Sequence, residues 1–330
     1  MKISDIKKIT DQLNKDHKSE LFIVLGDPTS GKIEIERVPC GRLSIDIPIG
    51  GGFPVGRIIE IYGPESSGKT TIALHAIAAF QKAFPKKAVA FVDYEHSFDP
   101  AYAKNLGLNT DELILSQPMH MEQGLQGIDK LIDTGNVSAI VIDSVAAMVP
   151  EKELAGDMGV SSVGVHAKQM SQAMRKLVGK AHRTGTTLFF INQLREKIGI
   201  MFGSPETTTG GKALKFYASI RLDVRAGVKQ KDKEGFIISS RGRMKVVKNK
   251  TYPPFKNSEF DMAFGTGVSR VSDILDYGEM AGIFLKKGSW YSLAEDGVKM
   301  GQGKEAAIAF LEEQTAITDE AEQILLDSLI

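Results

Sequence analysis

The stretch GPESSGKTT, residues 63–71, decides the fold of this chain. It contains the pattern G-x-x-x-x-G-K-T, follows the apolar run RIIEIY and precedes the helical pattern IALHAIAAF. A strand before and a helix after are the context of a phosphate-binding loop, in which backbone N–H groups and the helix N-terminus meet phosphate charge. We therefore expect the phosphates of a nucleoside triphosphate to be bound by Gly63, Pro64, Glu65, Ser66, Ser67, Gly68, Lys69, Thr70 and Thr71.

Two acids at the ends of other apolar runs extend this predicted site. Within the loop, Lys69 is expected to reach the outer phosphates and Thr70 to hold Mg²⁺. Asp143 ends the run AIVID, where a carboxylate can orient the Mg²⁺ shell, and Glu95 follows the run FVDY, where a carboxylate could activate water. Either acid could instead be an ordinary surface acid at a strand end.

The pattern of the chain predicts an α/β fold. Apolar runs alternate with helical patterns from about residue 42 to 225, which indicates a mostly parallel central sheet with crossover helices. We expect a core of the phosphate-loop type over residues 34–268. Before it, residues 1–33 are expected to form a helix and a strand (21–27) that serve oligomerisation. After it, residues 269–330 are expected to form a small α/β domain whose last helix is capped by Thr318 or Asp319 and buries Ile324, Leu325 and Leu329.

Composition limits the class of protein. Lys plus Arg equals Asp plus Glu at 41 each, so a polyanionic partner must be met by local basic patches. Cys40 is the single cysteine, which suits a reducing compartment and predicts a small buried side chain. The N-terminus has charges where a signal peptide needs an apolar core, and no apolar run approaches a membrane span. We expect a cytoplasmic protein without a membrane partner and without a structural metal among its six histidines.

Six motifs, the phosphate loop and five others, occur together and in order. They are GPESSGKTT, VDYEHSFDP, VIDSVAAMVP, MSQAMRKL, INQLREKIGIMFGSPETTTGGKALKFYAS and MKVVKNK followed by PPFK. Together they resemble the bacterial-type RecA recombinase family over about residues 40–310. The resemblance implies an ATPase core of RecA type with ATP and Mg²⁺ as cofactors. It also implies a filament on single-stranded DNA, DNA-dependent ATP hydrolysis, and homologous pairing and strand exchange with double-stranded DNA.

On the nucleotide side, the resemblance implies three pairs of residues. They are a general base with a sensor of the terminal phosphate, two residues that hold the adenine, and two lysines that reach across a filament interface to the neighbour's ATP. In that order the pairs are Glu95 with Gln193, Asp99 with Tyr102, and Lys248 with Lys250. The implied catalytic residues are thus Glu95, Lys69, Gln193, Lys248 and Lys250, and the implied nucleotide-binding residues beyond the loop are Asp99, Tyr102, Asp143 and Gly265.

On the DNA side, the resemblance implies two loops that face the filament axis, at about residues 154–165 and 196–209. Basic side chains and backbone N–H groups would meet phosphates, and Ile198 would wedge between base triplets. The implied DNA-binding residues are Val163, Lys168, Arg175, Arg195, Lys197, Ile198, Met201, Phe202, Thr207, Thr208, Thr209, Gly210, Gly211 and Lys212. Three positions depart from the family: Val163 replaces Met, Lys168 replaces Arg and Phe264 replaces Tyr.

Two stretches of the sequence allow a second interpretation. The basic run at residues 241–256 has six cations and no acid, and could be a solvated strand face as well as part of an ATP interface. The long loop at 196–209 could be a surface loop, although long loops inside compact domains tend to be functional. The alternative functions are a phosphotransferase and a nucleotide-gated assembly protein that does not exchange strands.

Overall fold

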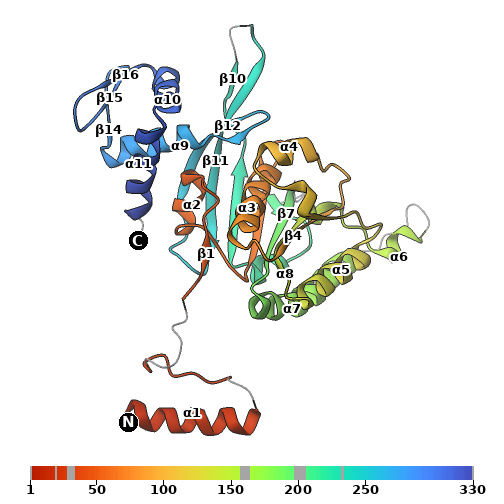
Figure 1. The fold of residues 1–330 in the computed structure, drawn as a ribbon. Coiled ribbons are helices and arrows are strands. Elements are labelled where there is room, and N and C mark those ends of the chain that lie inside the picture. The colour runs from red at the N-terminus through yellow and green to blue at the C-terminus, as the bar shows by residue number, and fades with distance from the viewer. Residues whose placement is uncertain are drawn as a thin grey trace. The chain divides into compact units, whose positions relative to one another are not determined.

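The computed structural model describes residues 2–18, 21–27, 34–156, 164–196, 206–231 and 234–328 (Figure 1). It divides into two compact units, Met1–Glu36 and Arg37–Ile330.

The described residues of the first unit include the helix α1 (Ile3–His17), none of whose residues is buried. The stretch 21–27, predicted to be a strand, has no strand structure, so that prediction is wrong. A strand exists only by pairing its backbone with another strand. In this unit the backbone of Phe22 bonds instead to the side chain of Asn14, with N–H to Oδ1 at 2.8 Å and Nδ2 to the carbonyl oxygen at 2.7 Å. Lys7 forms an ion pair with Asp27 at 2.6 Å.

The second unit is built on one large mixed sheet. In its described part the strands follow the order β13-β12-β11-β9-β3-β7-β6-β4-β5, with β8 paired to β7 and β10 to β11. The pairs from β9 through β3, β7, β6 and β4 to β5 are all parallel, as the alternation of runs predicts. The strands are β3 (Ile58–Gly63), β4 (Ala88–Asp93), β5 (Leu113–Ser116), β6 (Val137–Asp143), β7 (Thr187–Glu196), β8 (Glu206–Thr208), β9 (Ile220–Arg225), β10 (Lys229–Lys231), β11 (Ile237–Asn249), β12 (Asn257–Ala263) and β13 (Gly267–Val268).

Helices cover both faces of this sheet, because its central strands are apolar on both sides. On one face α3 (Lys69–Ala83) packs on Ile59 and Ile61, in the core that also holds Cys40. On the other face Ile58 packs with α5, α7 and α8. The helices and short strands of this part are β1 (Arg37–Val38), α2 (Leu43–Ile49), β2 (Phe53–Pro54), α4 (Pro100–Asn105), η1 (Thr110–Glu112), α5 (Met121–Asp133), η2 (Val145–Ala147), α6 (Glu151–Leu154), α7 (Val165–Thr184) and α8 (Ala213–Tyr217).

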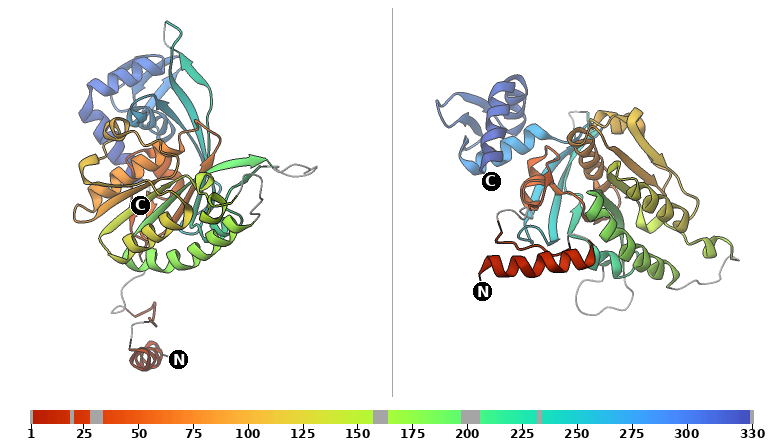
Figure 2. Two further views of the ribbon diagram at one scale, coloured as in Figure 1. Left: turned by 90° about the vertical axis from the view of Figure 1, so that its right-hand side faces the viewer. Right: turned by 60° about the horizontal axis from the view of Figure 1, so that its bottom comes forward.

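A small domain lies beside the β11 and β12 end of the sheet (Figures 1 and 2). It has its own core, which includes Phe284 and Leu311, and an antiparallel sheet of order β14-β15-β16. Its elements are α9 (Arg270–Ala281), β14 (Phe284–Lys287), β15 (Trp290–Leu293), β16 (Lys299–Gln302), α10 (Lys304–Glu313) and α11 (Thr315–Asp327).

The start of α11 differs from the sequence prediction. Its N-cap is Gln314 rather than Thr318 or Asp319. The Thr318 hydroxyl donates to the carbonyl oxygen of Leu311 at 2.6 Å, so it fastens α11 to α10 instead of capping a helix. Leu325 is buried as predicted, whereas Ile324 is 49 % exposed and Leu329 lies outside the described residues.

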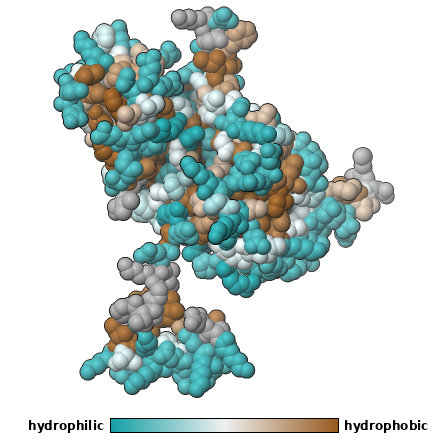
Figure 3. All heavy atoms as spheres, viewed as in Figure 1, coloured by the Kyte–Doolittle hydropathy of each residue, from teal (hydrophilic) through white to brown (hydrophobic). Residues whose placement is uncertain are grey.

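Apolar side chains also reach the surface (Figure 3). The hairpin formed by β10 and β11 exposes Val228 and Phe236, and the edge strand β5 exposes Ile114 and Leu115. Among the described residues, no helix is long and apolar enough to span a bilayer.

Candidate active site and nucleic-acid interface

The predicted phosphate loop joins the end of β3 to the start of α3. Its backbone approaches β9 so closely that a Cβ added at Gly63 would lie 1.9 Å from the carbonyl oxygen of Val224. Ser66 and Gly68 have φ of +56° and +92°, which turn the chain back over the N-terminus of α3. Only glycine adopts such a φ without strain, and the resulting loop points backbone N–H groups inward. The geometry is that of an anion-binding loop.

Lys69 and Thr70 already contact partners inside this loop. Lys69 Nζ donates to the carbonyl oxygen of Pro64 at 2.5 Å, and burial lowers the pKa of Lys69. Thr70 Oγ1 donates to Asp143 Oδ2 at 2.8 Å. Burial raises the pKa of Asp143 to about 6, since a carboxylate with little water around it favours the protonated form. A cation bound beside it would reverse that preference.

The donors present fit Mg²⁺. The hydroxyl of Thr70 and the carboxylate of Asp143 are hard oxygen ligands within one hydrogen bond of each other. In the described part of the chain no group of three or more His, Cys, Asp or Glu side chains forms a cation site. Mg²⁺ is usually held by one or two protein oxygens plus substrate phosphates and water, so a full protein cage is not required.

Glu95 lies beside this loop and is held from two strands. Its Oε1 accepts from Gln193 Nε2 at 3.0 Å and from the hydroxyl of Ser144. The buried carboxylate of Asp93 anchors the same turn by accepting the N–H of Glu95 at 3.1 Å and of Phe98 at 3.1 Å. Glu95 is exposed, but its carboxylate is held in place by the two hydrogen bonds from Gln193 and Ser144. One cavity is lined by Glu65, Ser66, Lys69, Thr70, Glu95, Asp143, Ser144, Ile191 and Gln193.

Sequence reasoning missed Ser144 and Asp93. Both had a signal, because Ser144 directly follows Asp143 and Asp93 ends β4, where it pairs in register with Asp143 on β6. Gln193 likewise pairs with Gly63, so the expected phosphate sensor adjoins the start of the phosphate loop.

The expected adenine residues lie next to the loop. The hydroxyls of Tyr102 and Thr71 are 2.8 Å apart. Asp99 is the N-cap of α4, where its Oδ1 accepts the N–H groups of Ala101 at 2.9 Å and Tyr102 at 3.1 Å. Gly265 has φ +90° in the turn after β12. The structure gives Asp99 a capping role and leaves the adenine role of these residues a prediction.

Lys248 on β11 and Lys250 just after it lie away from the phosphate loop, two strands across from β3 and toward the amino ends of the parallel strands. In the strand register Lys248 pairs with Arg221 of β9, and Arg221 pairs with Glu60 of β3, three residues before Gly63. Strands rise about 3.3 Å per residue and lie about 4.8 Å apart, so these lysines stand about 10 Å along and 10 Å across from the loop. The structure does not bring Lys248 together with the phosphate loop of its own chain.

Both lysines rest on the carbonyl end of α8. Lys248 Nζ donates to the carbonyl oxygens of Lys215 at 2.7 Å and Phe216 at 2.9 Å, and Lys250 Nζ to that of Phe216 at 3.3 Å. Burial, with Lys250 and Arg221 close by, lowers the pKa of Lys248 to about 8.

The rest of the basic run at residues 241–256 is not uniform. Arg241 contacts Glu259 at 2.9 Å, Asp276 at 3.2 Å and Asp261 at 3.4 Å. Asp261 and Asp276 also bind Lys304 at 2.7 and 2.8 Å. Arg241 therefore joins an ion network between β11, β12 and the small domain. Neither of the two interpretations of the run covers this residue.

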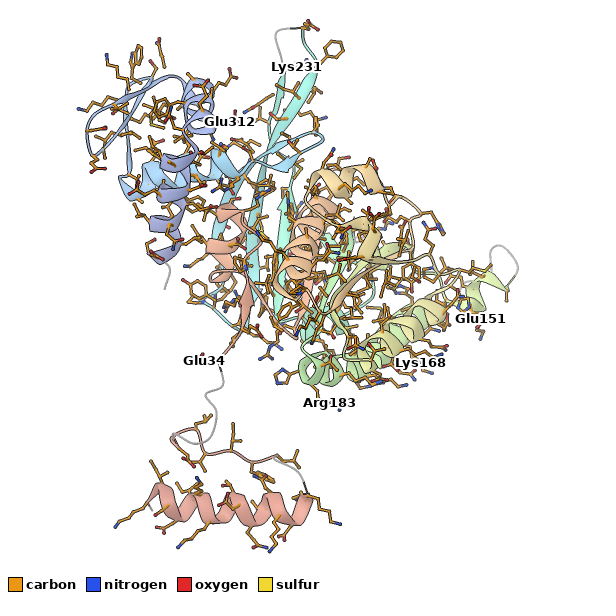
Figure 4. All side chains as sticks on the ribbon, viewed as in Figure 1. Glu34, Glu151, Lys168, Arg183, Lys231 and Glu312 are labelled. Carbon is orange, nitrogen blue, oxygen red and sulfur yellow. The ribbon has the colours of Figure 1, made fainter. Side chains whose placement is uncertain are left out.

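The described part of the expected DNA site surrounds the N-terminal half of α7, on which Lys168 lies (Figure 4). Arg175 is on the same helix, and Arg195 is exposed on β7. A Cβ added at Gly210 would lie 3.0 Å from Val145 Cγ1, and one added at Gly211 would lie 2.9 Å from Ala167 Cβ. Lys212 is the N-cap of α8. The predicted residues Val163, Lys197, Ile198, Met201 and Phe202 lie outside the described residues.

The threonines of this segment bridge to the sheet. Lys215 Nζ donates to Thr207 Oγ1 at 3.0 Å, and Asn192 Nδ2 donates to the carbonyl oxygen of Thr209 at 3.0 Å. Among the side chains that the structure describes, the buried hydroxyls of Thr208 and Thr209 have no hydrogen-bond partner. Asn192 was not predicted, although it precedes Gln193. The two neighbours thus contact Thr209 of the expected DNA segment and Glu95 of the expected nucleotide site respectively.

Comparison with known proteins decides the family. Residues 4–269 match the family model described as RecA N-terminal domain, and residues 272–329 match RecA C-terminal domain. The chain belongs to the RecA family. It is similar to Protein RecA of Nocardioides sp., with 54 % identity over 92 % of this chain and 85 % of that one. It is also similar to Protein RecA of Zymomonas mobilis, with 55 % identity over 89 % and 82 %.

A solved structure of the RadB recombinase shares the fold. Its TM-score is 0.52 and its identity 22 %, over 70 % of this chain and 98 % of that one. The prediction of a RecA-type α/β fold with a small C-terminal domain is confirmed. As a RecA protein, the chain is a DNA-dependent ATPase of homologous recombination and DNA repair.

Proposed function

We propose that the protein polymerises on single-stranded DNA with ATP and Mg²⁺ bound at the interface between subunits, and in that state pairs homologous double-stranded DNA and exchanges strands. Hydrolysis then serves turnover, because loss of the terminal phosphate weakens the interface. One observation carries the proposal. In the strand register Lys248 lies two strands across and three residues back from Gly63, a separation from the phosphate loop of its own chain that favours a role at the site of another copy.

Within one chain, the nucleotide is held by the residues that line the cavity beside the loop. Lys69 exchanges the carbonyl oxygen of Pro64 for a phosphate oxygen, and Thr70 with Asp143 holds Mg²⁺, which neutralises phosphate charge when bound. Glu95 takes a proton from the attacking water while Ser144 and Gln193 keep its carboxylate in place. When the terminal phosphate competes for the Gln193 amide, that hydrogen bond to Glu95 is the one that changes.

Assembly of copies is supported by apolar surfaces on both units. In the first unit Ile3, Ile9 and Phe22 are exposed, and α1 buries none of its residues. In the second unit the edge strand β5 exposes Ile114 and Leu115 next to a largely apolar cavity. An unpaired edge strand accepts another extended segment. We propose that residues 1–33 of one copy dock on β5 of the next, with 34–268 as the ATPase and DNA-binding core and 269–330 as a separate small domain.

DNA is bound through its phosphates. Lys168, Arg175 and Lys212 supply cations around the start of α7, and the Gly210 and Gly211 backbone supplies N–H groups. Contacts of this kind are indifferent to base sequence, so homology is tested by Watson–Crick pairing between strands. The absence of net charge makes this local patch the site of DNA capture, in the cytoplasm where the chain is expected to act.

Strand exchange tests the proposal. Protein, ATP, Mg²⁺ and a labelled single strand are mixed with homologous or heterologous duplex, and joint molecules are measured on a gel. We expect joint molecules with the homologous duplex alone, and DNA-stimulated ATP hydrolysis in parallel. Coated filaments that never form joint molecules would favour a nucleotide-gated assembly protein. Hydrolysis indifferent to DNA would favour a phosphotransferase.

A further inference from the structure

A carboxylate lies in the dry interior of the sheet, away from the phosphate loop. Glu60, in the middle of β3, is 0 % exposed. Its Oε2 accepts from Arg221 Nε of β9 at 2.5 Å, and its Oε1 accepts from Asn192 Nδ2 of β7 at 3.0 Å. It shares a sheet face with Ile58, the face covered by α7 and α8. An ionised group in such a place is costly unless it is paired, so both partners matter to it.

Asn192 is fully committed by three hydrogen bonds. Its Nδ2 donates to Glu60 and to the carbonyl oxygen of Thr209 at 3.0 Å, while its Oδ1 accepts the N–H of Gln193 at 2.9 Å. The side chain is fully buried. Both N–H groups of the Asn192 amide are already used, one by Thr209 and one by Glu60. A displacement of Thr209 would therefore also change the hydrogen bond from Asn192 to Glu60.

Arg221 connects Glu60 to the surroundings of Lys248. Its guanidinium lies 4.7 Å from the centre of the Tyr62 ring, and its side chain is 13 % exposed. It pairs in register with Lys248, just after a bulge in β11. Arg221 and Lys250 act on Lys248 as like charges, and Glu60 is the acid that offsets them.

We propose that Glu60 is a positioning residue that couples the DNA-binding segment at Thr209 to Lys248, the cation offered to the neighbouring copy's ATP. The inference rests on the proposed function, since it needs Lys248 to act in trans. One oxygen of Glu60 binds Asn192 of β7, the strand that contacts the DNA-binding segment. The other oxygen binds Arg221 of β9, the cation next to Lys248. When Thr209 moves, Asn192 moves with it, and the hold of Glu60 on Arg221 changes.

The variant Glu60→Gln keeps the shape and removes the charge. We expect the ratio of ATP hydrolysis with single-stranded DNA to hydrolysis without it to fall by about tenfold or more, within the range of known couplings. Binding of a fluorescent ATP analogue should stay within about twofold of the wild type, because Glu60 does not line the phosphate cavity. Single-stranded DNA should bind the wild type more tightly with a slowly hydrolysed ATP analogue than with ADP. In Glu60→Gln the ratio of these two affinities should shrink by the same factor.

A matched control separates coupling from folding. Asp273 is also a buried acid, 2 % exposed, which accepts from the N–H and the hydroxyl of Ser44 at 3.0 and 2.6 Å. Asp273→Asn should change thermal stability and leave DNA stimulation unaltered. If Glu60→Gln does not fold, Glu60→Gln with Arg221→Gln removes both charges and leaves two amides that can bond each other. That double variant should fold and still lack DNA stimulation.

The pH profile gives a further test that a merely structural role would not move. The charged and polar groups around Lys248 are Lys250 just after β11, Arg221 on β9, Glu60 on β3 and the carbonyl end of α8. Loss of the Glu60 charge should shift the alkaline limb of DNA-stimulated hydrolysis to lower pH. If the wild type shows DNA-stimulated hydrolysis, and Glu60→Gln keeps both the stimulation and the wild-type pH profile, the role of Glu60 is refuted and the proposed function stands. If wild type itself shows no stimulation, the proposed function fails.

Discussion

The molecule presents two lysine sites on one sheet, Lys69 at the carboxyl edge of the parallel strands and Lys248 on β11, two strands across from β3 and toward the amino edge. Both are desolvated, both have a lowered pKa and both donate to backbone carbonyl oxygens. They differ in their surroundings. Lys69 shares a cavity with Thr70, Asp143 and Glu95, whereas Lys248 is flanked by further cations and rests on α8.

In the proposed function, each chain carries two unlike halves of an ATP site. The half around Lys69 has the ligands for phosphate and Mg²⁺, and the half around Lys248 has charge but no phosphate loop. These two proposed half-sites lie apart within one chain. They can close between copies that associate head to tail, which generates an open helical polymer.

The largest expected effect comes from Lys69→Ala. Removal of the cation that meets the outer phosphates should lower ATP hydrolysis by about 10³-fold or more, with or without DNA. A steady-state phosphate-release assay measures this. Hydrolysis at the wild-type rate would contradict the placement of the nucleotide at this edge and end the comparison.

Lys248→Ala should lower DNA-stimulated hydrolysis by about 10²- to 10³-fold and leave nucleotide binding by the single chain intact. A mixture with Lys69→Ala sharpens the test, since an interface between the two variants has one intact half from each. Random assembly at equal amounts should restore about a quarter of the wild-type rate, because about one interface in four is then complete. A mixture no better than the sum of its parts would show that Lys248 does not act on a neighbour.

Glu95→Gln separates hydrolysis from assembly at the Lys69 edge. Loss of the general base should slow hydrolysis by about 10²-fold or more, while the amide keeps hydrogen bonds to Ser144 and Gln193. Filaments on single-stranded DNA should still form with ATP and should persist longer. Electron microscopy with a hydrolysis assay checks both, and a rate within about threefold of wild type would remove Glu95 from catalysis.

The Lys248 edge should depend on pH. With its pKa at about 8, Lys248 is mostly a cation at pH 7 and loses its charge as the pH rises through 8. ATP-dependent assembly on single-stranded DNA, followed by light scattering, should therefore fall about tenfold between pH 7 and pH 9. Lys248→Arg stays charged throughout this range and should flatten the profile. An equally steep fall in that variant would assign the titration to another group.

The smallest effect is expected at Asp273, which belongs to neither edge. Burial raises its pKa to about 7 from 3.8, so the folded chain favours the protonated acid. The stability this contributes is full below about pH 4 and is lost as the pH rises through 7. Asp273→Asn should therefore raise the unfolding temperature at pH 8 by a few degrees, about 1 kcal/mol or more, with little change at pH 4. ATP hydrolysis should be unaffected.

Much of the site could be predicted from local sequence. Residues 63–71 hold their phosphate-binding shape through features within the loop, and Asp143 and Glu95 come at the ends of apolar runs whose carboxyl ends meet at one edge of a parallel sheet. The alternation of these runs with helical patterns also predicted the fold class. Each of these properties depends on residues a few positions apart, so it can be predicted from a short segment of sequence.

Only the tertiary structure decided which distant residues meet. In the sequence, Glu60 comes more than a hundred positions before Asn192 and Arg221. The three residues meet because β3 lies between β7 and β9 in a particular register. The placement of Lys248 away from the phosphate loop follows from the same register and from the antiparallel direction of β11. Strand order and register depend on the packing of the whole sheet between its helices, and no short segment of sequence contains them. The stretch 21–27, which forms no strand, shows the same limit, since a strand needs a partner strand that its own residues cannot provide.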